Sequence, residues 1–505
     1  MKKIIVLLIF ALLFTTAPVS AKVEKEQRLW QDETVYSIMI DRFNDGDITN
    51  DHGVNSKDPV NYNGGDLQGV IDKLDYIKDM GFTAIKLSPV FDNADNGYHG
   101  YWVKDFYKVD EHFGSLNTMQ KLVKEAHKRK MKVIIDFVAN NVAKSHPWTR
   151  ASGKQDWFHK EKAIVDWNNQ KEVEDGWVDG LPDLNQGNPE VKQYLIDAAK
   201  WWIHKTDIDG YSLPEINAVP LSFWSDFSKA VKQEKKGFYL VGMSTPETST
   251  VNTDTYEKAG IISMFDYHQI NQTRIVFATT DQSVGSALSE DKNAEMNVNF
   301  FDNEYTTRFT KDIVEQRQFP GARWKTALTY AYTTPGIPFV YYGTEIALTG
   351  GDIPDNRRQM NFRAEKDLID YITKIAELRD QLPSLTKGSM EMLYDQKGMI
   401  VYKRVYKGET SIIAINNTKK SQKVTLTSEQ VEGNKELRGL LAGDLVRSYK
   451  GKYNIIIDRD NSEIYVLAEK TGLNVTFISA IAIAALLVLI FLLLIIRRSK
   501  RGQIN

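Results

Sequence analysis

The sequence feature that most constrains the fold is a regular alternation of short apolar runs and amphipathic segments from Trp30 to about Arg379. The runs AIKLSPV, KVIIDFVANN, GFYLVGM and GIPFVYYG are rich in β-branched and aromatic residues, which predicts buried strands. The segments LQGVIDKLDYIKDMG and SLNTMQKLVKEAHKRKM carry apolar residues at helical spacing. Alternation sustained over this length predicts an α/β fold with a parallel sheet, most economically a (β/α)8 barrel.

Two departures from this rhythm divide the chain. Residues 141–180 are polar and dotted with tryptophan, which predicts a domain inserted after the third strand of a barrel spanning about 30–384. After ITKIAELRDQLPSL, the runs GMIVYKRVYKGETSIIAINN and YNIIIDRDNSEIYVLA alternate apolar and polar residues between turn signals. We therefore predict a small antiparallel β domain over about 385–470.

The two ends of the chain predict its location. Residues 1–21 have two lysines, an apolar run and a Val-x-Ala ending, the layout of a secretory signal, with a buried strand or an uncleaved anchor as the alternative. Residues 475–496 carry no charge and are long enough for a transmembrane helix, and the basic tail 497–505 predicts a cytoplasmic C-terminus. We therefore expect a single-pass cell-membrane protein with most of its chain extracellular.

Charge and cysteine content exclude some functions. A formal net charge of -2 gives no electrostatic case for nucleic-acid binding. The chain has no cysteine, so it has neither disulfides nor thiol chemistry.

Several motifs together resemble the α-amylase family, glycoside hydrolase family 13. YSIMIDRFNDGD is similar to the first barrel strand of that family, YHGYWVKDFYKVDEHFGS to the loop after its second strand, and DFVANN to its third strand. LPDLN falls in its inserted domain, and TTPGIPFVYYGTEIALTGG with DNRRQMNF resembles the region from its seventh strand onward. LPDLN, the tandem Trp201–Trp202 and the C-terminal anchor resemble cell-bound Bacillus-type amylases. The resemblance implies a TIM barrel, an inserted domain and a C-terminal β-sandwich.

The same resemblance implies that the cleavage machinery is replaced. Retaining glycosidases need a carboxylate nucleophile and a carboxylic acid about 5 Å apart. The family's motif at strand four reads glycine, aromatic, arginine, apolar, aspartate, but this chain reads GYSLP, with Ser212 and Pro214 at the functional positions. Met243 stands where strand five carries its glutamate, and Tyr305 where strand seven carries its aspartate.

Two family histidines are also replaced, by Asn141 after the third strand and by Glu304 after the seventh. We therefore predict no catalytic residues and a non-catalytic protein. The alternative is an active site rebuilt from Glu215, Glu304 or Glu247, but one step along a strand reverses the direction of a side chain. The plainer interpretation of these glutamates is solvated loop charge.

Calcium is the predicted cofactor. Calcium takes six to eight oxygen ligands from carboxylates, amides and backbone carbonyls. The loop DRFNDGDITND and the following NGGD concentrate such groups, and related loops in cyclodextrin glucanotransferases and neopullulanases bind calcium. The predicted ligands are Asp45, Asp47, Asn50, Asp51, Gly64 and Asp66, with a solvated acidic turn as the alternative. Asn140 and Asp183 match two ligands of a second family site, whose backbone ligand would fall at Ala218 in a changed loop.

A sugar-binding cleft is the remaining expectation. His99, Tyr101 and Trp102 match residues that line the subsite beside the cleaved bond in the family, and aromatic faces stack on sugar rings. The alternative is that these rings pack the barrel mouth. Trp201 and Trp202 face different directions on a helix, so at most one can belong to the core.

Three functions follow. The first is a calcium-stabilised surface protein that binds α-glucan, a maltooligosaccharide or a surface partner without cleaving it. The second is an active α-glucan hydrolase or transglycosylase of carbohydrate metabolism that uses re-sited carboxylates. The third is an ectodomain that stabilises a membrane-protein partner.

Overall fold

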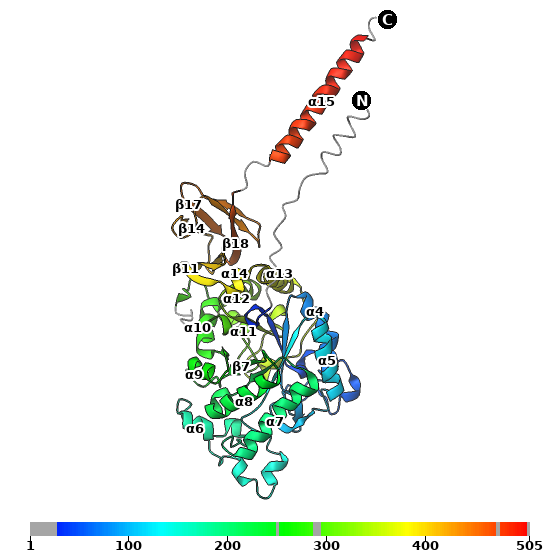
Figure 1. The fold of residues 1–505 in the computed structure, drawn as a ribbon, viewed down its shortest axis with the longest axis vertical. Helices are drawn as coiled ribbons and strands as arrows, with labels where there is room; N and C mark the ends of the chain where they lie inside the picture. The colour runs from blue at the N-terminus through cyan, green and yellow to red at the C-terminus, as the bar shows by residue number, and fades with distance from the viewer. Residues whose placement is uncertain (1–27, 249–251, 286–293, 471–474, 502–505) are drawn as a thin grey trace.

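The computed structural model describes residues 28–248, 252–285, 294–470 and 475–501 (Figure 1). The predicted signal peptide, residues 1–21, lies outside the described residues.

The centre of the molecule is an eight-stranded parallel sheet that closes into a barrel. Its strands, in the order in which they pair, are β8 (Ser263–Phe265), β7 (Tyr239–Met243), β6 (Gly210–Leu213), β5 (Lys132–Asp136), β2 (Ala84–Leu87), β1 (Val35–Ile38), β10 (Ile337–Tyr341) and β9 (Val298–Asn299). The end strands β8 and β9 also lie against each other. Nearly every residue of these strands is buried and most are apolar, as expected for parallel strands covered on both faces. The predicted TIM barrel is confirmed.

Amphipathic helices cover the barrel. Helix α5 (Leu116–Lys128) begins where the Ser115 side chain accepts a hydrogen bond from the backbone N–H of Thr118, and it buries Met119 and Leu122. The expected helix over 67–81 is two short helices, α3 (Leu67–Asp72) and α4 (Leu74–Asp79), because the backbone departs from helical geometry at Lys73. The other long helices are α7 (Pro189–Thr206), α8 (Leu221–Glu234), α10 (Tyr267–Ala278), α12 (Pro320–Thr333) and α13 (Asp367–Gln381).

Two segments that extend from the barrel form its mouth. After β2, the hairpin of β3 (Phe91–Asn93) and β4 (Val103–Val109) carries the YHGYW motif between its strands. After β5, a long segment contains only short elements, η3 (Pro147–Arg150), η4 (Gln155–Trp157), α6 (Gln170–Asp175) and η5 (Val178–Gly180), before α7 begins. An isolated bridge between Asn141 and Asp183 ties the two ends of this segment together.

The C-terminal domain is a β-sandwich, as predicted. One antiparallel sheet has the order β11 (Ser389–Gln396), β12 (Met399–Tyr406), β13 (Glu409–Asn416), β18 (Asn461–Glu469), β15 (Lys435–Gly439) and β16 (Leu445–Arg447). The second pairs β14 (Gln422–Thr427) with β17 (Lys452–Ile457). A separate apolar cluster that includes Val401, Leu426 and Ile455 fills the space between them.

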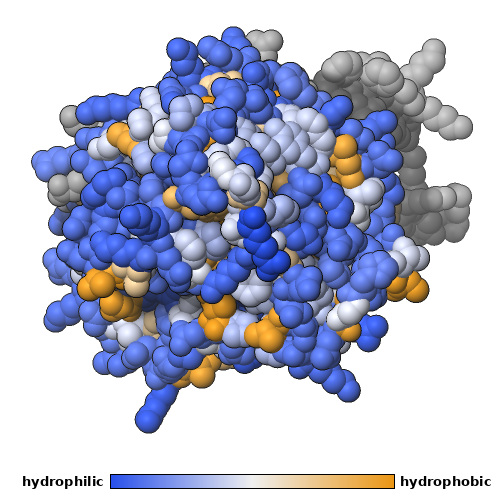
Figure 2. Space-filling view, turned by 90° about the horizontal axis from the view of Figure 1, so that it is seen from below, coloured by the Kyte–Doolittle hydropathy of each residue, from blue (hydrophilic) through white to orange (hydrophobic). Residues whose placement is uncertain are grey.

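The last described element, α15 (Val475–Arg501), stands apart from both domains beyond the β-sandwich (Figure 1). Ser479–Arg497 have a mean hydropathy of 3.3 and bury nothing, so the helix is long and apolar enough to cross a membrane. The opposite end of the molecule is mostly hydrophilic, with isolated apolar groups (Figure 2).

Candidate functional site

A cavity of about 710 Å³ opens at the barrel mouth between the hairpin after β2 and the segment after β5. His99, Tyr101 and Trp102, predicted from the sequence as sugar-binding residues, all line it. Asn141 follows β5, Glu215 follows β6 and Tyr305 follows β9, and these three also face the cavity. The loops at the C-terminal ends of the strands thus build one site, as they do in other barrels of this type.

The aromatic wall of the cavity is rigidly held. His99 is 7% exposed, and its Nδ1 accepts a hydrogen bond from the backbone N–H of Tyr101 at 3.1 Å. The Trp102 ring packs edge-on against His99, with centroids 4.8 Å apart. Burial, with Arg357 and Arg42 nearby, lowers the pKa of His99 well below its ordinary value. His99 is therefore neutral and serves as a packing and hydrogen-bonding group.

Beneath the cavity lies a buried ionic cluster. Lys86, from β2, places Nζ 3.0 Å from Asp136 Oδ2 and 2.5 Å from Glu304 Oε1. The hydroxyl of Tyr101 donates to the same two carboxylates, at 2.8 Å to Asp136 and 3.2 Å to Glu304. Lys86, Asp136 and Glu304 are 1%, 0% and 3% exposed. All three ionisable groups are thus committed to one another.

The electrostatics of this cluster favour the charged forms of Lys86 and Glu304 but not that of Asp136. Burial lowers the pKa of Lys86, but Asp136 and Glu304 outweigh that effect and leave it above the ordinary value. Burial raises the pKa of Glu304, yet Lys86 and the backbone overcome this and hold the pKa below its ordinary value. Asp136 responds mainly to burial, which raises its pKa to about 6.

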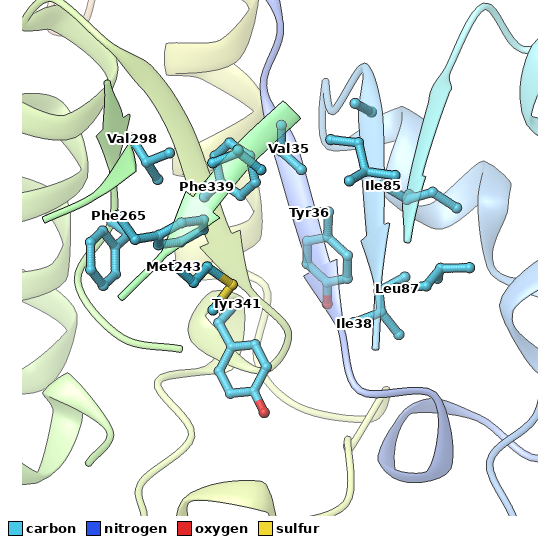
Figure 3. Packing of buried hydrophobic residues seen from close by; sticks show 14 of the residues in the cluster. Val35, Tyr36, Ile38, Ile85, Leu87, Met243, Phe265, Val298, Phe339 and Tyr341 are labelled. Atoms are coloured by element: carbon cyan, nitrogen blue, oxygen red, sulfur yellow. The ribbon is translucent and has the colours of Figure 1, made fainter. Parts of the chain in front are cut away.

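The residues aligned with the family's strand-four arginine and strand-five acid contact each other. The Ser212 hydroxyl donates to Met243 Sδ at 3.0 Å, and both residues are fully buried. Met243 lies in the same packed interior as Phe339 and Tyr341 (Figure 3). Pro214 follows β6 with no ionisable group, and Tyr305 packs its ring against Tyr101 at 5.6 Å. Hydrophobic packing occupies the positions where the resemblance places carboxylates.

One of the glutamates described above as solvated loop charge is buried. Glu304 is buried in the ionic cluster, so that interpretation was wrong for this residue. Glu215 has a left-handed backbone, φ 53°, and its Oε2 accepts a hydrogen bond from Asn140 Nδ2 at 3.3 Å. Burial, followed by repulsion from Asp179, raises the pKa of Glu215 to about 8. Only Glu247 is exposed at the surface, as the sequence indicated.

The first predicted calcium loop folds into one compact unit. At Gly64, φ +94°, a Cβ would lie 3.0 Å from Asp51 Oδ1 and 3.7 Å from Asp45 Oδ2, so only glycine leaves room between these carboxylates. Asn50 Oδ1 and Asp51 Oδ1 are buried without a hydrogen-bond partner. Burial, with repulsion from acidic neighbours, raises the pKa of both Asp45 and Asp51. These oxygens have the hard-ligand chemistry that calcium requires.

The other two predicted ligands of this loop have hydrogen-bonding roles. Asp66 accepts bonds from the backbone N–H groups of Gly69, at 2.6 Å, and Asp47, at 2.8 Å. Asp47 accepts from the backbone and the hydroxyl of Thr49. In the described part of the chain no group of three or more acidic, histidine or cysteine side chains is arranged around one point, so a cation here would also need amide and backbone oxygens.

The second predicted calcium site lies beside the cavity. Asn140 and Asp183 are fully buried, and each has an Oδ1 without a hydrogen-bond partner. The other oxygen of Asp183 accepts from His159 Nδ1 at 2.5 Å, and burial raises the pKa of Asp183 to about 7. Ala218, the expected backbone ligand, lies in the short helix η6 (Ile216–Ala218). The unpaired oxygens fit a cation, and Glu215 lies next to them.

Unpaired polar atoms also surround the cavity itself. Asn141 is 1% exposed, and neither its Nδ2 nor its Oδ1 has a hydrogen-bond partner. The Tyr305 hydroxyl and Glu304 Oε2 are likewise buried without one. A buried polar group costs free energy unless it is paired, so a bound polar molecule would relieve these groups.

Barrel, inserted segment, β-sandwich and strand-end cavity together form a fold found in a class of glycoside hydrolases. Residues 37–381 match the family described as the α-amylase catalytic domain, and residues 388–465 match the α-amylase C-terminal domain. The chain therefore belongs to the α-amylase family.

Two solved structures resemble it along nearly their whole length. An Anoxybacillus α-amylase is 54% identical with a TM-score of 0.84, and a Geobacillus thermoleovorans α-amylase complexed with acarbose is 51% identical with a TM-score of 0.83; each match covers 88% of this chain and all of the other.

Among curated relatives, a β/α-amylase of Paenibacillus polymyxa is 35% identical over 85% of this chain, and the match spans 37% of that protein. A cyclomaltodextrinase of Thermoanaerobacter pseudethanolicus is 31% identical over 80% of this chain and 73% of its own length.

The feature that sequence reasoning missed is Lys86. The run AIKLSPV predicts a buried strand, and a lysine inside such a run needs a buried anionic partner. That signal was present in the sequence. Its partner could not be chosen from the sequence, because Glu304 lies 218 residues away.

Proposed function

We propose that this chain is a non-catalytic, membrane-anchored member of the α-amylase family that binds an α-glucan or maltooligosaccharide outside the cell. The observation that carries the proposal is the buried contact between Ser212 and Met243 on the neighbouring strands β6 and β7. Retaining cleavage needs two carboxyl groups about 5 Å apart, one nucleophilic and one protonated. A hydroxyl and a thioether supply neither.

Carbohydrate binding is supported by what remains in the cavity. His99, Tyr101 and Trp102 form an aromatic wall, and Asn141 and Tyr305 offer unpaired polar atoms. Aromatic faces with a few convergent polar groups are the usual composition of a small-molecule site. A similar α-amylase has been solved with acarbose, which supports an oligosaccharide as the ligand here.

Calcium is proposed as a stabilising ion. Asp45, Asn50 and Asp51 would hold it in the first loop, and Asn140 with Asp183 in the second. Bound calcium would neutralise carboxylates that now repel one another and would tie loops to the barrel.

Membrane anchoring is supported by α15, an apolar helix of which none of the described side chains is buried. The basic residues at the C-terminal end of α15 favour a cytoplasmic tail. The barrel and β-sandwich would then be displayed on the outer surface, where extended glucans are accessible.

The test is to assay one purified preparation for hydrolysis of soluble starch and for binding of maltooligosaccharides. We expect binding without release of reducing ends. Binding of neither starch nor maltooligosaccharide, together with capture of a defined membrane protein, would favour the role of a partner-stabilising ectodomain.

A second function, an active hydrolase or transglycosylase, is favoured by one observation. Glu215 faces the cavity, and burial raises its pKa to about 8, as in a general acid. Reducing ends that disappear in Glu215→Gln would support this function over the first.

A further inference from the structure

The β-sandwich lies between the barrel and the apolar helix α15, on the side of the barrel away from the cavity (Figure 1). Arg404 of β12 donates to the backbone oxygen of Thr333 at 2.6 Å, and Thr333 ends α12 just before β10 begins. Strand β18 begins next to Asp460, which forms an ion pair with Arg323 of α12, and its nine residues extend about 30 Å to Glu469. The sandwich thus packs at the N-terminal ends of the barrel strands and leads the chain away from the cavity, which opens at their C-terminal ends.

The chain between the sandwich and α15 is short. Residues 471–474 separate Lys470, which follows β18, from Val475, where α15 begins. The five backbone steps from Lys470 to Val475 span at most about 18 Å. With α15 across a membrane, as proposed above, this end of the sandwich therefore lies at the headgroup layer or close above it.

A tight hairpin stands at the same end of the sandwich. Lys470 Nζ donates to the backbone oxygen of Ser448 at 3.4 Å, so the point where the chain leaves the sandwich lies beside this hairpin. Tyr449 and Lys452 exchange backbone hydrogen bonds at 2.9 and 3.1 Å, and the two residues between them have positive φ. This is the geometry of a type I′ turn, which fixes the tip relative to the flanking strands.

The hairpin presents an aromatic ring next to positive charge. The Tyr449 side chain is 70% exposed, and Lys450 Nζ lies 5.4 Å from the centroid of its ring. Lys452 and Lys470 are also exposed. In the part of the chain that the structure describes, no carboxylate lies within ion-pair distance of these three lysines.

The other cations at this end are already paired with carboxylates. The ion pairs are Arg438–Glu436, Arg447–Glu436, Lys435–Glu432 and Lys435–Glu469. Glu429, exposed in the turn after β14, adds one further negative charge. The three lysines outnumber it, so the end of the sandwich from which α15 departs is positive.

We propose that the hairpin Tyr449–Lys452 binds the anionic headgroups of the membrane that α15 spans, and so holds the cavity facing away from the lipid. Tyrosine rings are enriched at the headgroup level of membranes, and lysines near the surface are attracted to anionic lipids. The proposal rests on the anchoring by α15 in the proposed function. It goes beyond that anchoring, because an anchor alone limits the distance of the barrel from the membrane but not its orientation.

The first experiment locates the hairpin. The chain has no cysteine, so the fluorophore NBD attached to Tyr449→Cys, Ile456→Cys or Val165→Cys reports from one position only. The full chain is reconstituted into vesicles of phosphatidylcholine and phosphatidylglycerol in a ratio of about 7 to 3, with or without TEMPO-labelled headgroups as quencher. We expect strong quenching at Tyr449→Cys, weaker quenching at Ile456→Cys further along β17, and none at Val165→Cys in the segment after β5.

The second experiment removes the charge. Lys450→Gln/Lys452→Gln should lower the quenching at Tyr449→Cys by about 2-fold or more, as should vesicles of phosphatidylcholine alone. Lys420→Gln/Lys423→Gln removes the same charge from exposed positions at the other end of the β14–β17 ladder and should change nothing. Thermal unfolding of each variant is compared with that of the wild type to show that it is folded.

Each contrary result has a distinct meaning. Protein that does not float with the vesicles would overturn the anchoring in the proposed function. Anchored protein with equal quenching at Tyr449→Cys and Val165→Cys would overturn the membrane contact and the orientation. Quenching that responds neither to the lysine substitutions nor to lipid charge would overturn the role of the lysines. Quenching that is lost when the chain is diluted among excess vesicles would assign the hairpin to a second copy of the chain instead of the lipid.

Discussion

The Ser212 hydroxyl donates a hydrogen bond to the sulfur of Met243 at 3.0 Å, inside a barrel where both residues are fully buried. The resemblance places an arginine and a carboxylic acid at these two positions. A thioether is only a weak acceptor and does not ionise, so this pair can neither orient a nucleophile nor protonate a leaving group. Met243 instead joins the apolar packing of neighbouring strands (Figure 3).

The first prediction concerns hydrolysis. The wild-type protein should release no reducing ends from soluble starch or maltooligosaccharides, because Pro214, Met243 and Tyr305 stand where the resemblance places the three carboxyl groups. A variant that restores the family residues should release some; its substitutions are Ser212→Arg, Pro214→Asp, Met243→Glu, Glu304→His and Tyr305→Asp. A reducing-sugar assay measures both.

The structure adds one requirement to this repair. Glu304→His removes one of the two anionic partners of Lys86, so the buried lysine would remain with Asp136 alone. Adding Lys86→Met should therefore increase the yield of folded protein and the rate of the repaired variant. Wild-type activity that is abolished by Glu215→Gln would contradict the whole interpretation.

The second prediction concerns stability. Removing one partner of a buried ion pair leaves the other charge uncompensated, which typically costs about 3–5 kcal/mol. Lys86→Met should lower the free energy of unfolding by about that amount, as measured by denaturant titration. Lys128→Met should change it by less than about 0.5 kcal/mol, because that lysine is exposed. Equal losses in both variants would show that the buried cluster contributes no special stability.

The fold could be predicted from sequence because it depends on repeating patterns. The strands around Ile85, Ile134, Leu240 and Phe339 were recognisable as continuous apolar runs, which parallel strands buried on both faces produce. The break at Lys73, which divides one expected helix into two, has no comparable signal in the composition of that segment.

The site could be predicted only where residues near one another in sequence form it. His99, Tyr101 and Trp102 fall in one motif and were found, and all three line the cavity. The ionic cluster joins Lys86 on β2 with Glu304 beyond β9, and only the closure of the barrel brings them together. Glu304 stands one residue before Tyr305, where the resemblance places a catalytic aspartate. Its burial depends on Lys86, a partner that pattern analysis cannot identify.

The third prediction concerns calcium. Adding calcium to EDTA-treated protein should raise its melting temperature. A calcium concentration of about 100 times the dissociation constant would stabilise the folded protein by about 2.7 kcal/mol. Asp51→Asn should weaken this effect, because Asp51 Oδ1 is an unpaired buried oxygen beside Gly64. Asp72→Asn, an exposed carboxylate at the end of α3, is the control.

Terbium luminescence measures the same site directly by displacement with calcium. A melting temperature that responds to calcium equally in wild type and Asp51→Asn would exclude this loop as the stabilising site. The same comparison with Asp183→Asn tests the second site.

The fourth prediction concerns pH. A hydrogen bond to the Asp209 carboxylate raises the pKa of His127. The distance between His127 Nε2 and Asp209 Oδ2 is 2.8 Å. The charge of Lys235 lowers the pKa of His127, and the charge of Asp207 raises it. Because its folded-state pKa is raised, protonated His127 stabilises the protein fully at pH values below the unfolded-state pKa of about 6.5. This stabilisation is lost as the pH rises through the folded-state pKa.

The measurement compares the wild type with His127→Gln across pH 5 to 9. The wild type should be more stable by about 1 kcal/mol at the acidic end, since the pair is partly exposed, and this difference should shrink toward alkaline pH. A difference that grows with pH would have the wrong sign for a charged His127.

The fifth prediction concerns the membrane. Because the chain has no cysteine, single cysteines report topology without background. The Val165 side chain is 84% exposed, so Val165→Cys should react with a membrane-impermeant maleimide on intact cells. Ser499 lies in the basic last turn of α15, after its apolar span, so Ser499→Cys should react only after permeabilisation. Protein that ends at Lys470 lacks α15 and should appear in the medium instead of the membrane fraction. Labelling of both cysteines on intact cells, or membrane retention of the shortened chain, would rule out a single C-terminal anchor with the barrel outside.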